Sequence, residues 1–272
     1  MAPKQTPALK LRKVFTMELM SPREAASFAL SLLDLTNLRD DCDNAAIENL
    51  CLRAQTPYGH SAAICIWPRF VAHARGILGE GNAVRIATVV NFPSGDLPVA
   101  EVVAETEKAA ADGADEIDLV IPYRAFMEGD EAAVAAMVSA VRAACPNSCL
   151  KVILETGELK DAGLVRRASE LAIEAGADFI KTSTGKVTVN ATLEAADIML
   201  RAIRDSKKKV GFKPAGGIST VSDADLYLRL AETIMGPNWI MPSTFRFGAS
   251  SLLDDILGVL SGNTSSRASS GY

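Results

Sequence analysis

The feature that most constrains the fold is a regular alternation of short apolar runs with longer, Ala-rich segments. Eight runs rich in β-branched and aliphatic residues end in turn residues, and they start roughly 22 to 35 residues apart, about the length of one strand, one helix and two loops. Strands that alternate with helices predict a parallel sheet, and eight such units close a (β/α)8 barrel. An open, doubly wound sheet is the alternative. The predicted strands cover residues 32–36, 62–67, 84–90, 116–121, 150–155, 177–182, 209–214 and 244–248.

The segments between these runs show the apolar periodicity of amphipathic helices. Residues 99–113 end at a glycine, as a helix C-terminus often does. Residues 159–176 and 192–206 begin with a capping residue or an early acid and carry Arg or Lys later, which suits the helix dipole. We therefore predict helices over these ranges.

An internal repeat supports the barrel over the open sheet. The segments AADGADEID (110–118) and IEAGADFIK (173–181) share a helix end, a GAD turn and a strand start, at an offset of 63 residues. The repeat relates the fourth and sixth predicted strands, and alternate strands of a barrel supply side chains to the same interior layers. Under this offset Asp118 aligns with Lys181.

The length of 272 residues fits one domain, because single α/β barrels run to about 250 residues. Residues 261–272, SGNTSSRASSGY, are small and polar without periodicity, and no internal segment has that character. We expect one barrel domain over residues 1–260, with a short N-terminal helical extension, followed by a flexible C-terminal tail over 261–272.

Composition excludes several classes of protein. Hydrophobic residues make up 49% of the chain and charged residues 22%, which is typical of a globular protein and not of a disordered one. A net charge of −5 gives no broad positive field, so no nucleic-acid partner is expected. No apolar run approaches the roughly 18 residues of a membrane span. Five cysteines, an odd number without a CxxC pair, favour reduced thiols and a cytoplasmic protein.

Three charged residues stand where a strand interior is normally apolar. Lys181, Lys213 and Asp118 each lie near the C-terminal end of a predicted strand. By the period of two, Lys181 shares a face with Phe179, and Lys213 shares one with Gly211. Any one of them could instead face a helix or solvent. Active sites of α/β barrels lie at this end of the strands, so the three together favour a shared site.

Two lysines and an aspartate at a barrel mouth suggest an amine that attacks a carbonyl to form a Schiff base. The amine must be neutral, so its pKa must fall from about 10.4 to roughly 7 to 8, a change worth about 4 kcal/mol. A second ammonium roughly 4 Å away supplies about 4 kcal/mol at an effective dielectric constant near 20. Lys213, on the strand next to Lys181, could supply that charge, and Asp118 could shuttle protons with water or with Lys213.

The loops after the seventh and eighth predicted strands suggest a phosphate site. PAGGIST (214–220) places Gly216 and Gly217 before a helix, and FGASSLL (247–253) places Ser250 at another helix start. Glycine lets backbone N–H groups approach an anion, helix N-termini add partial positive charge, and barrels commonly bind phosphate at this position. Lys186 in STGK could add a charge or could be an ordinary exposed lysine.

Spacing excludes several other chemistries. The GK of STGK is not a P-loop, because the glycine required five positions before Gly185 is Ile180. His60 and His73 are the two histidines and there is no HExxH, so a zinc-dependent aldol reaction lacks its usual ligands and we expect no metal site. Cys65 ends a predicted strand and could face the pocket, although buried cysteines usually serve packing.

Taken together, these motifs resemble the deoxyribose-phosphate aldolase (DeoC) family of class I Schiff-base aldolases. The resemblance extends through LLDLTNL, AAICIWPRF, RIATVVNFPSG, GADEIDLVIPYRAF, LKVILETGEL, GADFIKTSTGK, VGFKPAGGI and FRFGASSLL, in the order of that family. It implies that Lys181 is the Schiff-base lysine, Lys213 the second lysine and Asp118 the proton-relay acid. It also implies a barrel that reversibly cleaves 2-deoxy-D-ribose 5-phosphate to D-glyceraldehyde 3-phosphate and acetaldehyde, without a metal or an organic cofactor.

The resemblance implies a cytoplasmic homodimer that acts in deoxynucleoside breakdown. Ser219 stands where some relatives carry a basic residue, and the chain ends SSGY, with Gly271 before Tyr272, where relatives often end SSY. The implied phosphate contacts and pocket-lining positions are Gly216, Gly217, Ser250 and Lys186, with Asp34 and Cys65.

Two other functions stay open at this point. Another lysine Schiff-base lyase of the same fold would use a ketone or keto acid as donor. A sugar-phosphate sensor would bind in the pocket without chemistry, but binding alone gives no reason to bring two buried ammonium groups together.

Overall fold

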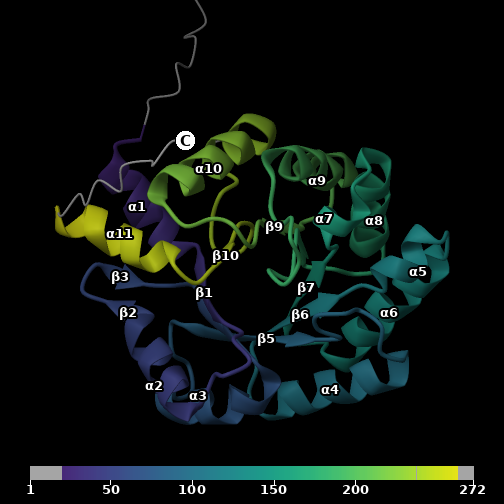
Figure 1. Ribbon diagram of the computed structural model, residues 1–272, viewed down its shortest axis with the longest axis horizontal. Helices are drawn as coiled ribbons and strands as arrows, with labels where there is room; N and C mark the ends of the chain where they lie inside the picture. The colour runs from purple at the N-terminus through teal and green to yellow at the C-terminus, as the bar shows by residue number, and fades with distance from the viewer. Residues whose placement is uncertain (1–19, 237, 263–272) are drawn as a thin grey trace, which may run out of the picture.

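Eight parallel strands form one curved sheet with the helices outside it (Figure 1). The computed structural model describes residues 20–236 and 238–262. The strand order is β10-β1-β4-β5-β6-β7-β8-β9. The strands are β1 (Leu33–Asn37), β4 (Ala63–Ile66), β5 (Arg85–Val90), β6 (Glu116–Val120), β7 (Cys149–Ile153), β8 (Phe179–Lys181), β9 (Gly211–Lys213) and β10 (Phe247–Ala249).

The sheet closes between β9 and β10 through short parallel bridges. Phe212 pairs with Phe245, and Ala215 pairs with Gly248. The N–H of Gly248 donates to the carbonyl of Pro214 at 2.9 Å. This closure confirms the predicted barrel and excludes the open sheet, which has two free edges.

The eighth strand begins later than predicted, at Phe247 instead of residue 244. The N–H groups of Thr244 and Phe245 both donate to the carbonyl of Met241, at 2.9 and 2.8 Å. A tight turn therefore occupies residues 241–245, and the chain enters the regular ladder only after it.

The helices surround the barrel, and a small hairpin, β2 (Gln55–Thr56) with β3 (Gly59–His60), follows the second of them. Helix α1 precedes the first strand, as the expected N-terminal extension does, and packs against α10 and α11. The helices are α1 (Pro22–Ser31), α2 (Asn44–Arg53), the 3-10 turn η1 (Pro68–Phe70), α3 (Val71–Leu78), α4 (Val99–Ala111), α5 (Tyr123–Met127), α6 (Glu131–Ala144), α7 (Thr156–Leu159), α8 (Ala162–Glu174), α9 (Leu193–Ser206), α10 (Val221–Met235) and α11 (Leu252–Ser261).

The predicted helix over 159–176 is divided in the structure. Helix α7 ends at Leu159, and Lys160 adopts a left-handed backbone conformation with φ of 57°. Asp161 then caps α8, because its side chain accepts a hydrogen bond from the N–H of Leu164 at 2.9 Å. The local capping preference of Asp161 outweighs the continuous apolar periodicity.

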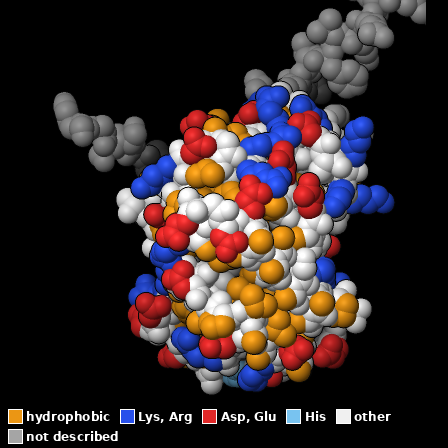
Figure 2. All heavy atoms as spheres, turned by 90° about the vertical axis from the view of Figure 1, so that its right-hand side faces the viewer, with side chains coloured by type: hydrophobic (Ala, Val, Ile, Leu, Met, Phe, Trp, Pro, Cys, Tyr) orange, Lys and Arg blue, Asp and Glu red, His pale blue; other side chains and the backbone are white. Residues whose placement is uncertain are grey.

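Outward-facing strand residues and the inner faces of the helices form the main apolar core. Ile64, Ile86, Ile117 and Val152 are fully buried there. The outer face formed by α5, α6 and α8 carries charged side chains of both signs among small apolar ones (Figure 2). Exposed ion pairs of this kind contribute little, so most of the stability comes from the core.

The inside of the barrel has a different composition on its two sides. On β4 and β5, Ala63, Cys65, Ala87 and Val89 form a second, smaller apolar cluster with Leu38. Most of the other strands bring charged side chains to the interior.

Within residues 20–236 and 238–262 no helix is long and apolar enough to cross a membrane. The predicted C-terminal tail falls almost wholly outside the described residues, because α11 continues to Ser261 and the description ends at Gly262. Gly271 and Tyr272 therefore lie outside the described residues, and the boundary at residue 260 stays a prediction.

Candidate active site

Seven charged side chains meet inside the barrel. Each belongs to a residue that is at most 6% exposed, and they come from β1, β6, β7, β8, β9 and the residue before β10. Buried charges are normally paired, because an isolated buried charge is very costly. The seven are Asp34, Glu116, Asp118, Lys151, Lys181, Lys213 and Arg246.

Asp118 lies at the centre of this cluster. Its Oδ2 accepts hydrogen bonds from Lys181 Nζ at 2.7 Å and from Lys213 Nζ at 2.8 Å, and its Oδ1 accepts one from Lys151 Nζ at 2.9 Å. Burial raises the pKa of Asp118, but the three lysines outweigh burial and hold the pKa well below the usual range. The structure thus brings together Asp118, Lys181 and Lys213, the three residues that the sequence analysis selected.

Lys213 is held as a charged group next to the amine of Lys181. Its Nζ donates to Asp34 Oδ2 at 2.5 Å as well as to Asp118. Burial lowers the pKa of Lys213, but the carboxylates of Asp118 and Asp34 raise it by more. The pKa of Lys213 therefore lies above the ordinary lysine value. Gly248 makes room for this side chain, since a Cβ at that position would lie 3.1 Å from Lys213 Cε.

Six of the seven charges form a closed ring in which the sign alternates. From Arg246 the contacts run through Asp34, Lys213, Asp118, Lys151 and Glu116 and return to Arg246, at distances from 2.5 to 2.9 Å. Three cations and three carboxylates make this ring neutral when every member is ionised.

Lys181 is the seventh charge and lies outside the ring. It contacts one carboxylate, Asp118, whereas Lys213 and Arg246 each contact two and Lys151 contacts three. Loss of the Lys181 proton breaks one ion pair and leaves the ring neutral, whereas loss of any other proton breaks at least two pairs. The geometry therefore selects Lys181 as the amine that can act as a nucleophile.

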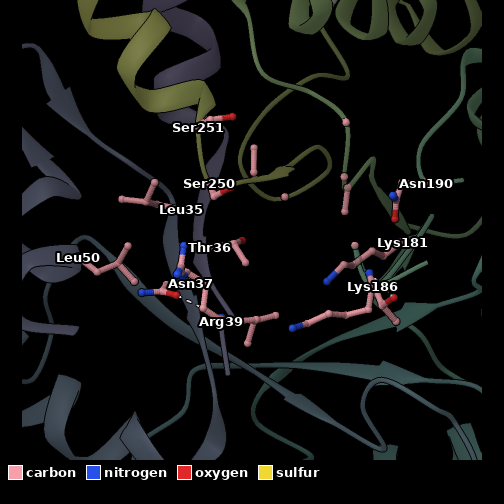
Figure 3. Close-up of a pocket in the computed structure, with 18 of the residues that line it drawn as sticks. Leu35, Thr36, Asn37, Arg39, Leu50, Lys181, Lys186, Asn190, Ser250 and Ser251 are labelled. Carbon is pink, nitrogen blue, oxygen red and sulfur yellow. Dashed lines mark hydrogen bonds between the residues drawn. The ribbon is translucent and has the colours of Figure 1, made fainter. Parts of the chain in front are cut away.

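Lys181 also reaches the cavity at the carboxyl ends of the strands. This cavity has a volume of about 630 Å³, and Lys181 is the member of the charged cluster that lines it. Lys181 and Lys186 extend into it from one side, while Ser250 and Ser251 lie across the opening from Lys186 (Figure 3). The amine thus faces a space large enough for a small sugar phosphate.

The loops predicted to bind phosphate form part of the cavity wall. Gly216 and Gly217 both have positive φ, 83° and 82°, and a Cβ at Gly216 would lie 2.7 Å from Asn190. Among the described residues, the backbone N–H groups of Gly217, Ser250 and Ser251 have no hydrogen-bond acceptor. Helix α11 begins directly after Ser251, so its N-terminus adds partial positive charge at the same place.

Lys186 lies at the cavity rim, and its side chain is 31% exposed. Its Nζ is 3.4 Å from Asp40 Oδ1 and 5.7 Å from the centre of the Trp67 ring. These contacts are weak, so the ammonium is available to an anion in the cavity. Ser219 lies outside the lining and instead donates its N–H to Asp223 at 3.0 Å, in the turn that starts α10.

Asp34 and Cys65 do not line the cavity, in contrast to the expectation from the resemblance. Both are fully buried inside the barrel and are not among the residues that line the cavity. Burial raises the pKa of the Cys65 thiol. Burial also raises the pKa of Asp34, but Lys213 and Arg246 outweigh burial and hold this pKa low.

Comparison with known proteins agrees with this geometry. The family model described as DeoC/LacD family aldolase matches residues 28–258. This chain belongs to the DeoC/LacD aldolase family. The chain is 74% identical, over 258 residues, to the deoxyribose-phosphate aldolase of Agrobacterium fabrum, and the match covers 94% of this chain and 100% of that protein. The family resemblance drawn from the motifs is confirmed, and the chain is accordingly a carbon–carbon lyase.

Solved structures of the same family share the fold. A protein assigned as a deoxyribose-phosphate aldolase from Coccidioides immitis has a TM-score of 0.77 at 31% identity, over 87% of both chains. A protein with the same assignment from Toxoplasma gondii has a TM-score of 0.83 at 25% identity, over 89% of this chain and 96% of that one.

Three members of the charged cluster escaped the sequence analysis. Lys151 lies in the predicted strand 150–155, Glu116 begins the predicted strand 116–121, and Arg246 lies in FRF. A signal was present, because Glu116 shares a strand face with Asp118 under the period of two. Charges at the C-terminal ends of strands mark a barrel site, and these three residues lie farther from that end.

Proposed function

We propose that this chain is a class I aldolase that reversibly cleaves 2-deoxy-D-ribose 5-phosphate to D-glyceraldehyde 3-phosphate and acetaldehyde, in the breakdown of deoxynucleosides. One observation carries the proposal. The Lys181 amine enters the cavity with a single carboxylate partner, on the oxygen that also binds the charged Lys213. An amine that reaches the cavity and has one ion-pair partner is the arrangement that a Schiff-base nucleophile needs.

The reaction begins when the Lys181 amine attacks the aldehyde carbon of the open-chain sugar to give a carbinolamine. Asp118, acting with water or with Lys213, passes a proton to the carbinolamine hydroxyl, which leaves as water, and takes up the proton that the nitrogen gives up. The resulting iminium draws electrons from the bond between C2 and C3 as the C3 hydroxyl loses its proton. That bond breaks, and D-glyceraldehyde 3-phosphate is released.

The enamine left on Lys181 then takes a proton at C2 and becomes the iminium of acetaldehyde. Water adds to this iminium, and acetaldehyde leaves as the free amine is restored. The iminium takes up the electrons of the C2–C3 bond as that bond breaks, so we propose that neither a metal nor an organic cofactor takes part.

We propose that the phosphate of the substrate binds at Gly216, Gly217, Ser250 and Lys186. The support is the N–H groups of Gly217 and Ser250, which have no protein acceptor, together with the weakly held Lys186 ammonium. The N–H of Gly216 donates to the carbonyl of Gly248 at 3.3 Å, and Gly216 lines the same cavity. A phosphate bound there places the other end of the sugar toward Lys181, across the same cavity.

We further propose that residues 1–260 form one domain and that the chain works as a homodimer in the cytoplasm. The five cysteines support a reducing compartment, because all of them are free thiols. Light scattering on the purified chain checks the dimer, and a monomer at assay concentration contradicts it.

The experiment follows acetaldehyde and glyceraldehyde 3-phosphate released from deoxyribose 5-phosphate in EDTA, for the parent chain, Lys181→Ala and the control Lys108→Ala. Lys108 is an exposed lysine that pairs with Asp112 on α4. We expect turnover by the parent and by the control and none by Lys181→Ala. A folded parent without turnover contradicts the proposal, as does inhibition by EDTA that zinc reverses.

Two further experiments separate the proposed aldolase from another Schiff-base lyase and from a sugar-phosphate sensor. Acetaldehyde, acetone and pyruvate are compared as donors in the condensation direction, and a preference for a ketone or keto acid indicates another Schiff-base lyase. Thermal stabilisation by deoxyribose 5-phosphate without turnover indicates a sensor.

A further inference from the structure

Arg246 and Glu116 complete the charged ring from the end of the barrel opposite the cavity. Glu116 is the first residue of β6, and Arg246 precedes the first residue of β10. Neither residue lines the cavity. Any effect of these residues on the reaction must therefore pass through the other members of the ring.

The contacts of Arg246 fix its position. Its Nη1 donates to Asp34 Oδ1 at 2.6 Å, its Nη2 donates to Glu116 Oε1 at 2.8 Å, and its Nε donates to the carbonyl of Pro242. The guanidinium also lies over the ring of Phe179, 5.9 Å from its centre. Phe179 can lie there because Gly211 has no Cβ, which would approach the ring within 2.4 Å.

Two chains of contacts lead from Arg246 to the nucleophile. One passes through Asp34 and Lys213 to Asp118, and the other passes through Glu116 and Lys151 to Asp118. Both end on the carboxylate that binds Lys181. A charge added to or removed from Arg246 or Glu116 therefore changes the electrostatic environment of Asp118 through both series of ion pairs.

Stability alone does not account for the ring. Replacing a buried ion pair by well-packed apolar residues of similar volume is often neutral or stabilising. The same barrel fills its β4 and β5 side with Ala63, Cys65, Ala87 and Val89. A closed and neutral ring is therefore better explained by its electrostatic effect on Lys181, the lysine of the cluster that lies outside it.

We propose that Arg246 and Glu116 are positioning residues for the Schiff-base reaction, which hold Asp34 and Lys151 as charged partners and so set the charge balance against which Lys181 releases its proton. This inference rests on the proposed function. The low pKa of Asp34 and the raised pKa of Lys151 agree with it: burial opposes both shifts, and the opposite charges of the ring outweigh burial.

Several charged or titratable groups face the Lys181 amine, and Lys186, Arg39 and Arg53 line the same cavity at its solvent side. Asp118 contacts the amine directly, and the other ring members lie one to three contacts beyond. Cys65 on β4 and Glu155 after β7 add weaker electrostatic effects. Burial raises the pKa of both of these groups. Arg246, Glu116 and Asp34 are the ring members that do not contact Asp118, and of these Arg246 and Glu116 do not contact Lys213 either.

The test measures how the extent of borohydride trapping with acetaldehyde, at a fixed short time, depends on pH. Glu116→Gln removes a negative charge, so the ammonium of Lys181 becomes less favourable and the midpoint moves to lower pH. Arg246→Met removes a positive charge, so the midpoint moves to higher pH. For charges roughly 10 Å apart at an effective dielectric constant near 20, each shift is about one pH unit.

Two controls separate charge balance from a structural role. The double variant Glu116→Gln with Arg246→Met restores the net charge of the cluster, so its midpoint returns to within about 0.3 pH unit of the parent. Arg246→Lys keeps the charge and is expected to keep the midpoint. Should Arg246→Met fail to fold, Glu116→Gln and the double variant still give different expectations, since the first lowers the midpoint and the second returns it to the parent value.

Shifts of opposite sign that cancel in the double variant support the inference. Variants that lose trapping equally at all pH values, or whose midpoints move in the same direction or not at all, contradict it. A parent chain that is not trapped by borohydride contradicts the proposed function instead, so the two failures are distinguishable.

Discussion

The two sides of the barrel interior are filled by different kinds of side chain. On β4 and β5 the space is filled by small apolar side chains such as Ala87 and Val89, whereas the opposite side buries the charged ring and Lys181. Burying charge is expensive even when it is paired, so the apolar side shows what filling the barrel requires. The charged side shows what the chemistry requires. The account therefore predicts that changes on one side alter activity and changes on the other alter stability.

The largest effect is expected from Asp118→Asn. This change removes the carboxylate shared by Lys151, Lys181 and Lys213 and leaves four cations with two carboxylates. We expect kcat for deoxyribose 5-phosphate cleavage to fall by about 10³-fold, within the range for a lost proton-transfer group. The control Asp112→Asn removes a half-buried carboxylate at the C-terminal end of α4, outside the barrel, and is expected to keep full activity. An Asp118→Asn enzyme within tenfold of the parent contradicts the central place of this carboxylate.

A smaller effect is expected at the phosphate end of the cavity. Lys186→Ala removes an ammonium at the rim, so KM for deoxyribose 5-phosphate is expected to rise about tenfold, the value of one charged hydrogen bond, with kcat nearly unchanged. Cleavage of unphosphorylated deoxyribose serves as the control and is expected to stay the same. An equal loss with both substrates assigns Lys186 a role other than phosphate binding.

The apolar side gives the opposite pattern. Val89→Ala leaves a small cavity beside Cys65 and Ala87, so the free energy of unfolding is expected to fall by about 1–3 kcal/mol. Denaturant unfolding measures this loss, and kcat at a temperature where the variant is folded is expected to stay within twofold. A large fall in kcat without loss of stability breaks the distinction between the two sides.

The smallest expected effect is on the pH dependence of the melting temperature. Burial raises the pKa of Asp34 and of Asp118, but their cationic partners outweigh it, so both folded-state values lie below the unfolded value of about 3.9. These groups stabilise the fold above that pH, and the stabilisation is lost as the pH falls through the folded-state values. We expect Tm to fall by at least about 2 °C between pH 5 and pH 3, and less in Asp34→Asn. Equal slopes for the parent and the variant count against this linkage.

The sequence predicts the barrel well because strands and helices have different apolar periods, and these periods alternate along the whole chain. It places the start of the last strand too early, since the turn that begins at Met241 involves no glycine that would mark it. The break between α7 and α8 is hidden in the same way, because Leu159 continues the apolar period of the next helix.

The site is predictable in part. Lys181, Lys213 and Asp118 are recognisable because each puts a charge near the end of an apolar strand. The ring partners are harder to recognise, because a charge such as Glu116 at a strand start is usually exposed to solvent. Pairing of Arg246 with Asp34 joins residues 212 positions apart, and the full burial of Cys65 away from the cavity lining is a property of the whole barrel. Both are set by closure of the sheet and not by local sequence.

The most direct test of the account is the identity of the residue that borohydride labels. The parent chain is incubated with deoxyribose 5-phosphate, reduced with borohydride and digested, and mass spectrometry locates the two-carbon adduct left by acetaldehyde. The account predicts a single adduct on Lys181, because Lys151 and Lys213 are each held by at least two carboxylates. An adduct on Lys151 or Lys213, or no adduct on a folded chain that turns over substrate, contradicts the claim that the neutral ring leaves Lys181 as the reactive amine.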